Sequence, residues 1–162
     1  MNVAEALLAQ ARVRPHDPAI VAGREGATVT FAQLEETSAR RASLLRGAGL
    51  RPGDVTLVFQ PVSPDLYATL IAIFRLGAVA MFLDPSGGRE DIDRCCALEP
   101  PRALIATPKA HLLRLFSSAL RRVPLKFSAG PAVPGARGLG AARRASPLAG
   151  VELGRASCRE RV

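Results

Sequence analysis

The chain contains 162 residues, of which 48% are hydrophobic and 22% charged, a composition typical of a globular protein with one domain. Its net charge is +8, but residues 130–162 carry half of that excess, and only 4% of all residues are aromatic. Both facts argue against nucleic-acid binding, which needs a focused basic patch and rings for base stacking. Since no secretory signal or lipidation motif follows Met1, we expect a cytoplasmic protein with reduced thiols.

The N-terminal part of the chain predicts two helices joined by a small hairpin. Asn2 is a suitable N-cap for the first helix. Two short apolar runs within residues 19–30 flank the letters GREG, which is the pattern of a hairpin. Thr30 and Gln33 then form a capping box that starts the second helix, and Gly47 marks its end.

The most apolar stretch, LYATLIAIFRLGAVAMFLDP at residues 66–85, is long enough to suggest a membrane span. Arg75 and Gly77 lie in its middle, however, and a charge at the centre of a spanning helix costs about 3 kcal/mol. We therefore predict two elements. A helix capped by Ser63 ends at Gly77, and residues 78–83 follow as a strand buried on both faces.

From residue 55 onward, predicted strands and helices alternate. The strands are 55–59, 78–83, 102–106 and 125–128, and the helices between them are 64–76, 89–98 and 108–121. Alternating units of this length imply a parallel sheet with right-handed crossovers. The predicted fold class is thus α/β, with a mainly parallel sheet and flanking helices.

The pattern stops after residue 130. Residues 130–153 are rich in Gly, Ala, Pro and Arg, which predicts a disordered, linker-like segment. The last nine residues, GRASCRERV at 154–162, match the translation of a DNA sequence that resembles a common sequencing-library adapter. We expect this ending to be foreign to the protein and to mark the end of a sequenced DNA fragment.

Residues with catalytic or metal-binding chemistry are sparse and scattered. Cys95 and Cys96 are adjacent, Cys158 lies in the adapter-like ending, and His16 and His111 are far apart, so no zinc spacing is present. The G-x-S-x-G motif of a nucleophile elbow is absent as well. We expect one packed and one partly exposed thiol in the cysteine pair, and a His111 that packs or caps on its helix.

Three glycine-rich stretches resemble phosphate loops. Residues 47–53 follow a helix and are better explained as a cap and a turn, and residues 135–140 lack a flanking strand and helix. The best-placed stretch is DPSGG at residues 84–88, between a strand and a helix start, where backbone amides could hold an anion. It lacks the Lys-Ser/Thr ending of a P-loop, so a structural turn stays the main interpretation.

Taken in order, several motifs resemble the opening of the AMP-dependent synthetase/ligase, or adenylate-forming, superfamily. They are TFAQLE at residues 30–35, GLRPGD at 49–54 and FRLGAVAMFLDP at 74–85. The later residues 84–114 are similar to a narrower branch, fatty acyl-CoA ligase-like proteins that include olefin β-lactone synthetases. Phe74, Leu76 and residues 80–82 depart from the usual L-K-A-G-x-x-x-V-P pattern, which affects the branch more than the superfamily.

The resemblance implies that residues 1–129 are an incomplete part of the N-terminal AMP-binding domain. The complete enzyme would use ATP and Mg²⁺, and in some members CoA, to adenylate a carboxylate such as a fatty acid. The family's Ser/Thr/Gly-rich loop ending in P-K-G, its aromatic-Gly-x-Thr-Glu segment, its ribose-binding Asp and its C-terminal Lys do not occur here. The TPKAH run from Thr107 to His111 has no preceding glycines, so it does not replace that loop. We therefore assign no catalytic, cofactor-binding or metal-binding residue.

Two further expectations follow. As an incomplete domain, the chain should be inactive, need no cofactor of its own and tend to self-associate through uncovered apolar surface. The alternative is a self-contained small α/β module that binds a nucleotide or anion at DPSGG and the neighbouring strand ends.

Overall fold

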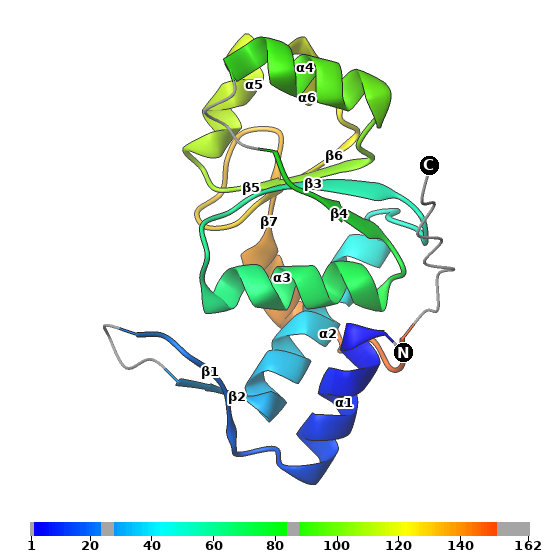
Figure 1. The fold of residues 1–162 in the computed structure, drawn as a ribbon, viewed down its shortest axis with the longest axis vertical. Coiled ribbons are helices and arrows are strands. Elements are labelled where there is room, and N and C mark those ends of the chain that lie inside the picture. Colours follow the sequence, from blue (N-terminus) through cyan, green and yellow to red (C-terminus); the bar gives the residue numbers. More distant parts are fainter. Residues whose placement is uncertain (1, 24–27, 84–87, 152–162) are drawn as a thin grey trace, which may run out of the picture.

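The computed structural model describes residues 2–23, 28–83 and 88–151, and it confirms the predicted α/β fold with a mainly parallel sheet (Figure 1). The elements, with η marking 3-10 helices, are α1 (Val3–Val13), β1 (Pro18–Val21), β2 (Thr28–Thr30), α2 (Phe31–Gly47), β3 (Val55–Phe59), α3 (Pro64–Arg75), β4 (Val79–Met81), α4 (Gly88–Leu98), β5 (Ala103–Ala106), η2 (Ala110–Leu112), α5 (Leu113–Phe116), α6 (Ser118–Arg122), β6 (Leu125–Ser128), β7 (Arg137–Gly138) and η3 (Leu139–Arg144).

The main sheet is the middle layer of three. Its strand order is β4-β3-β5-β6-β7, and every neighbouring pair is parallel. Helices α1, α2 and α3 lie on one side of the sheet, and α4, α5 and α6 lie on the other (Figure 1). Two helical layers can therefore bury both faces of the central strands.

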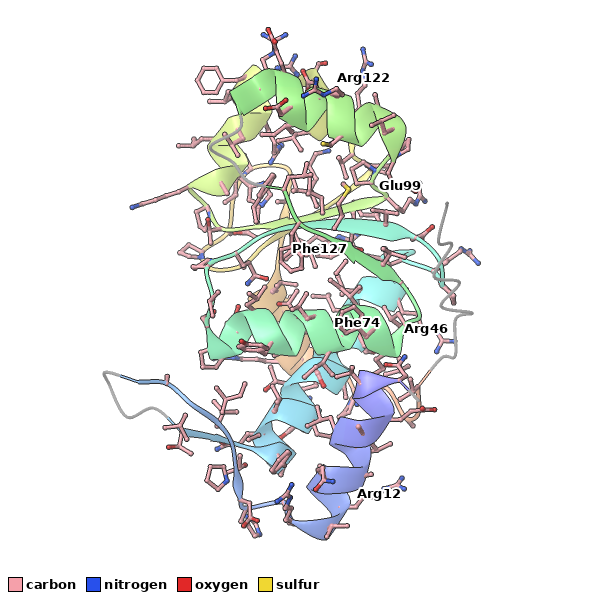
Figure 2. The ribbon with its side chains drawn as sticks, viewed as in Figure 1. Arg12, Arg46, Phe74, Glu99, Arg122 and Phe127 are labelled. Carbon is pink, nitrogen blue, oxygen red and sulfur yellow. The ribbon has the colours of Figure 1, made fainter. Side chains whose placement is uncertain are left out.

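Alternation along the strands divides the core between the two faces. Val58 and Ile105 point to the side of α2 and α3, while Leu57 and Leu104 point to the side of α4 and α6. Phe127 on β6 is 1% exposed and fills the space between the sheet and α3 (Figure 2). Since residues on both faces are apolar, the central strands are continuous hydrophobic runs in the sequence.

The apolar stretch at residues 66–85 divides into a helix and a strand at Gly77, as predicted. Ser63 Oγ accepts a hydrogen bond from Leu66 N at 3.2 Å, and Gly77 has a φ of 64°, the left-handed conformation that glycine adopts without strain. Within the described ranges, no helix has the length and apolar character to cross a membrane.

The strand after Gly77 differs from its prediction. It covers only Val79–Met81 and lies at the end of the sheet order, where it pairs with β3 alone. Val79 is 49% exposed and Phe82 is 52% exposed, so the expectation of a strand buried on both faces is wrong. An apolar run shows that the side chains are hydrophobic. It does not show whether the strand lies at the centre or at the edge of a sheet, because that depends on which strands pair.

The single helix predicted at residues 108–121 is also wrong. The chain forms η2, α5 and α6, with a break at Ser117, whose φ of −100° and ψ of 121° are extended. Ser117 Oγ caps α6 by accepting from Leu120 N at 3.2 Å and donates to the Asp93 carboxylate of α4. A contact from another helix therefore replaces helical continuation at this serine.

The disorder predicted for residues 130–153 is contradicted over the described part of that segment. Strand β7 extends the main sheet, and η3 buries Leu139 and Ala142 against the layer of α2. Leu148 N donates to Ala39 O at 3.1 Å. Composition alone wrongly predicted disorder here, because the few apolar residues of this segment pack on a surface that α2 and the sheet supply. Residues 154–162 lie outside the described residues.

The N-terminal predictions are confirmed. Asn2 and Thr30 each form a full capping box, at the start of α1 and α2 respectively. Strands β1 and β2 form an antiparallel hairpin, whose connecting residues 24–27 lie outside the described ranges. Asn2 Nδ2 also donates to Phe74 O at 2.7 Å, so the first cap attaches α1 to the end of α3.

One buried cation joins three segments that are distant in sequence. Arg75, at the end of α3, is 1% exposed and forms an ion pair with Glu35 of α2. Its Nη1 donates to the carbonyls of Leu148 at 3.3 Å and Gly150 at 3.1 Å. The guanidinium thus fixes the chain after η3 against the first helical layer.

We predict that Arg75→Met destabilises the chain by about 3 kcal/mol, because the substitution leaves the Glu35 carboxylate and two carbonyls without their donor. Urea unfolding measures the loss. Arg12→Met is the control, since Arg12 is exposed on α1 and should change stability by less than about 0.5 kcal/mol. Equal effects of the two substitutions would contradict a structural role for Arg75.

We also predict that Gly77→Ala lowers the free energy of unfolding by about 1 kcal/mol, because a Cβ is unfavourable at a φ of 64°. Gly47→Ala is the matched control. Gly47 is the last residue of α2, a Cβ there meets nothing within 4 Å, and alanine favours helix, so stability should stay constant or rise. A stable Gly77→Ala variant would argue against the left-handed cap.

Candidate functional site

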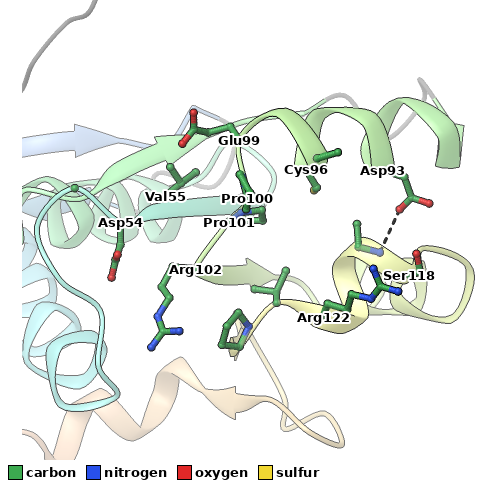
Figure 3. Close-up of a pocket in the computed structure, with 15 residues that line it drawn as sticks. Asp54, Val55, Asp93, Cys96, Glu99, Pro100, Pro101, Arg102, Ser118 and Arg122 are labelled. Carbon is green, nitrogen blue, oxygen red and sulfur yellow. Dashed lines mark hydrogen bonds between the residues drawn. The ribbon is translucent and has the colours of Figure 1, made fainter.

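A cavity of about 610 Å³ lies at the amino ends of β3, β5 and β6, between α4 and α6 (Figure 3). Charged side chains from four segments line it: Asp54 before β3, Asp93 and Glu99 from α4 and its end, Arg102 before β5, and Arg122 of α6. Ligands of open parallel sheets bind outside the carboxyl ends of the strands, which is the opposite edge. The location therefore argues against a catalytic site.

Asp93, one of the titratable groups of this cavity, has structural partners. The Ser117 hydroxyl donates to Asp93 and holds the pKa of that carboxyl below its usual range, although burial acts in the opposite direction. Ala119 N donates to the same carboxylate at 3.3 Å, so Asp93 connects α4 to α6. Burial raises the pKa of the Cys96 thiol, and the Asp93 charge adds to that effect. A protonated thiol is a poor nucleophile.

The remaining charges do not form a reactive constellation. Neither the Arg102 nor the Arg122 side chain has a hydrogen bond or ion pair to any described residue, and Figure 3 shows Asp54, Glu99 and the two arginines distributed around the cavity. No group of three His, Cys, Asp or Glu residues in the described ranges could hold a metal ion. We interpret the cavity as a surface groove.

At the carboxyl end of β5, the TPKAH run serves packing. Thr107 Oγ1 accepts from Ala110 N at 3.3 Å, and His111 is 3% exposed. His111 Nε2 donates to Phe127 O at 3.0 Å, which leaves Nδ1 to accept from Arg114 at 3.4 Å. The histidine joins η2 to β6, as expected for a packed residue.

The other sequence candidates have mixed outcomes. In DPSGG, residues 84–87 lie outside the described ranges, and Gly88 begins α4. Residues 47–53 form the predicted cap and turn, with positive φ at Gly49 and Gly53. Residues 135–140 were predicted to lack flanking elements, which is wrong, because they include β7 and the start of η3. Cys96 is buried and Cys95 is partly exposed, as predicted.

Comparison with known families decides the wider assignment. The AMP-binding enzyme family matches residues 7–136. The chain belongs to this family. It is 36% identical over 124 residues to the olefin β-lactone synthetase of Stenotrophomonas maltophilia, which is 70% of this chain and 22% of that protein. It is also 36% identical over 117 residues to a feruloyl-CoA synthase of Amycolatopsis, or 71% of this chain and 23% of that protein.

Solved structures agree on the fold. A benzoate CoA ligase from Burkholderia xenovorans superposes with a TM-score of 0.79 at 21% identity, covering 94% of this chain and 30% of that enzyme. Acetoacetyl-CoA synthetase from Streptomyces lividans gives 0.80 at 23% identity, covering 94% and 26%. The chain thus spans less than a third of the length of the relatives and structures compared here.

Enzymes of this family use ATP and Mg²⁺. Triphosphate needs backbone amides and a lysine, and Mg²⁺ needs carboxylate oxygens. The printed sequence has no Ser/Thr/Gly-rich loop ending in P-K-G, and the described residues hold no carboxylate cluster for a metal. The described residues therefore do not fit this group.

We predict that stability falls with pH below about 6.5 through His111. Burial lowers its pKa from 6.5, and Arg114 and Lys126 oppose a further positive charge. The unfolded state therefore binds more protons, so stability is highest above pH 6.5 and declines until the folded-state pKa is passed. Unfolding free energies between pH 7.5 and 5 should change less with pH in His111→Gln.

The control for this measurement is His16→Gln, at an exposed histidine in the turn after α1. It should keep the pH dependence of the parent chain. If His16→Gln removes the dependence and His111→Gln preserves it, His111 is not the responsible group.

Proposed function

We propose that this chain is the N-terminal portion of an ATP-dependent acyl-activating enzyme. The complete protein would join a carboxylate to AMP with release of pyrophosphate, and would then transfer the acyl group. A fatty acid is the proposed substrate, because the relatives include an olefin β-lactone synthetase and long-chain fatty acid transport protein 1 of mouse. The feruloyl-CoA synthases among the relatives make an aromatic acid the competing choice.

One observation carries the proposal: the similarity covers 70% or more of this chain but less than a third of each relative and solved structure named above. The benzoate CoA ligase superposition uses 94% of this chain and 30% of the enzyme. A self-contained module of the same fold would be expected to match proteins of its own length. The numbers therefore support a portion of a larger adenylate-forming enzyme.

Within that enzyme, the proposed role of these residues is to build one helix-covered sheet that supports the rest of the domain. The outer edge of β4 has no paired strand among the described residues, and Leu115 and Phe116 of α5 are 67% and 65% exposed. Such surface favours association when it is left uncovered. We propose accordingly that the isolated chain self-associates. We separately propose that the enzyme is cytoplasmic.

We predict no ATP–pyrophosphate exchange by residues 1–162 with long-chain fatty acids or ferulic acid. Removing a single donor to the transferring phosphate typically costs about 10²–10³ in rate, and here the entire loop is missing. A complete adenylate-forming enzyme with its own acid serves as the positive control. Exchange that depends on added acid and is catalysed by the 162-residue chain would contradict the proposal.

A second test uses the complete gene from which this sequence derives. We expect a longer reading frame that encodes a Ser/Thr/Gly-rich loop ending in P-K-G, and exchange activity from its complete product. A genomic stop codon directly after residue 162 would instead favour the alternative, a self-contained α/β binding module.

A further inference from the structure

A second cavity, of about 420 Å³, lies beside the carboxyl end of β6, between α2, the first turn of α3 and η3. Ala129 and Gly130, which directly follow β6, form one wall. Arg40 and Arg41 of α2 and Arg143 of η3 line the other sides. Unlike the 610 Å³ cavity, this one is at the edge of the sheet where ligands of parallel α/β folds bind.

Two of its three arginines are neutralised by carboxylates. Arg40 forms an ion pair with Glu36 at 2.8 Å. Arg41, which is 8% exposed, forms one with Asp65 and donates to Thr69 Oγ1 at 2.8 Å. The Asp65 carboxylate, the one acid among the described residues that line the cavity, also accepts from Gln60 at 3.0 Å. Its negative charge is therefore engaged by donors already present.

The third arginine is uncompensated. The Arg143 side chain is exposed at the cavity and has no hydrogen bond or ion pair to any described residue. The Thr37 hydroxyl, one turn before Arg41 on the same wall, likewise has no described partner. At Gly140, a Cβ would meet nothing within 4 Å, so this wall is open. The cavity thus combines a free guanidinium and a free hydroxyl with space beside them.

The backbone that carries Arg143 is held in place. Arg40 Nη1 donates to the carbonyls of Arg143 at 3.2 Å and Ala145 at 2.7 Å, and Leu139 and Ala142 of η3 are buried. Since η3 is fixed before any ligand arrives, binding at Arg143 orders little beyond one side chain.

We propose that this cavity binds a small oxyanion with the chemistry of a phosphate group. Arg143 would supply a two-pronged charged donor, and Thr37 would supply a hydroxyl. The inference is independent of the proposed function. The residues that would bind the anion, Thr37 and Arg143, lie outside the three motifs that resemble the family.

Isothermal titration of the 162-residue chain with inorganic phosphate, at pH 7.5 and constant ionic strength set with NaCl, tests the proposal. We expect a dissociation constant on the order of 1 mM. Arg143→Gln should weaken binding about tenfold, because it removes a charged donor, and Thr37→Val about fivefold. Neither side chain has a described partner, so both variants should fold.

The control is Arg144→Gln. Arg144 is the neighbouring exposed arginine of η3 and does not line the cavity. Its replacement by Gln lowers the net charge by the same amount as Arg143→Gln. It should bind phosphate like the parent chain. Equal weakening by Arg143→Gln and Arg144→Gln, or no phosphate binding by the parent chain, overturns the proposal.

A second readout locates the bound ion. In amide-resolved NMR, phosphate should shift the Gly130 and Gly140 signals in the parent chain, and in Arg143→Gln the same shifts should need about tenfold more phosphate. Shifts confined to residues around Arg102 and Arg122 would place the anion in the 610 Å³ cavity and would also overturn the proposal.

Discussion

The buried guanidinium of Arg75 is the interaction on which the arrangement of the first helical layer depends. A cation that is 1% exposed must find acceptors within the protein, because its removal from water is costly. It finds them on Glu35 of α2 and on two carbonyls beyond η3. Helices α2 and α3 and the chain near residue 150 are thereby held in one arrangement, so a segment poor in apolar residues is ordered.

Arginines elsewhere in the chain repeat this use of backbone carbonyls. Arg40 holds η3 through the carbonyls of Arg143 and Ala145, and Arg114 donates to Pro134 O at 3.3 Å beside the buried His111. In each case a guanidinium on a regular element fixes a loop that returns to it. Part of the strongly positive composition is therefore structural.

The two edges of the sheet differ in chemistry. The amino edge carries a groove of mixed charge whose carboxylate, Asp93, connects two helices. Beside the carboxyl end of β6 lies the smaller cavity with the uncompensated Arg143. A sheet of this family thus presents open polar groups at its ligand edge even in a chain that spans 22% of a relative's length.

The sequence by itself determined the fold class, the family, the helix caps and the division at Gly77, because these depend on local periodicity and on short-range hydrogen bonds. Tertiary structure alone decided that β4 is an edge strand, that Ser117 breaks a helix, and that residues 130–151 are ordered. The cavity at Arg143 belongs to the second group as well. Its walls come from α2, α3, the end of β6 and η3, and no spacing along the chain reveals which arginines meet carboxylates and which one is left without a partner.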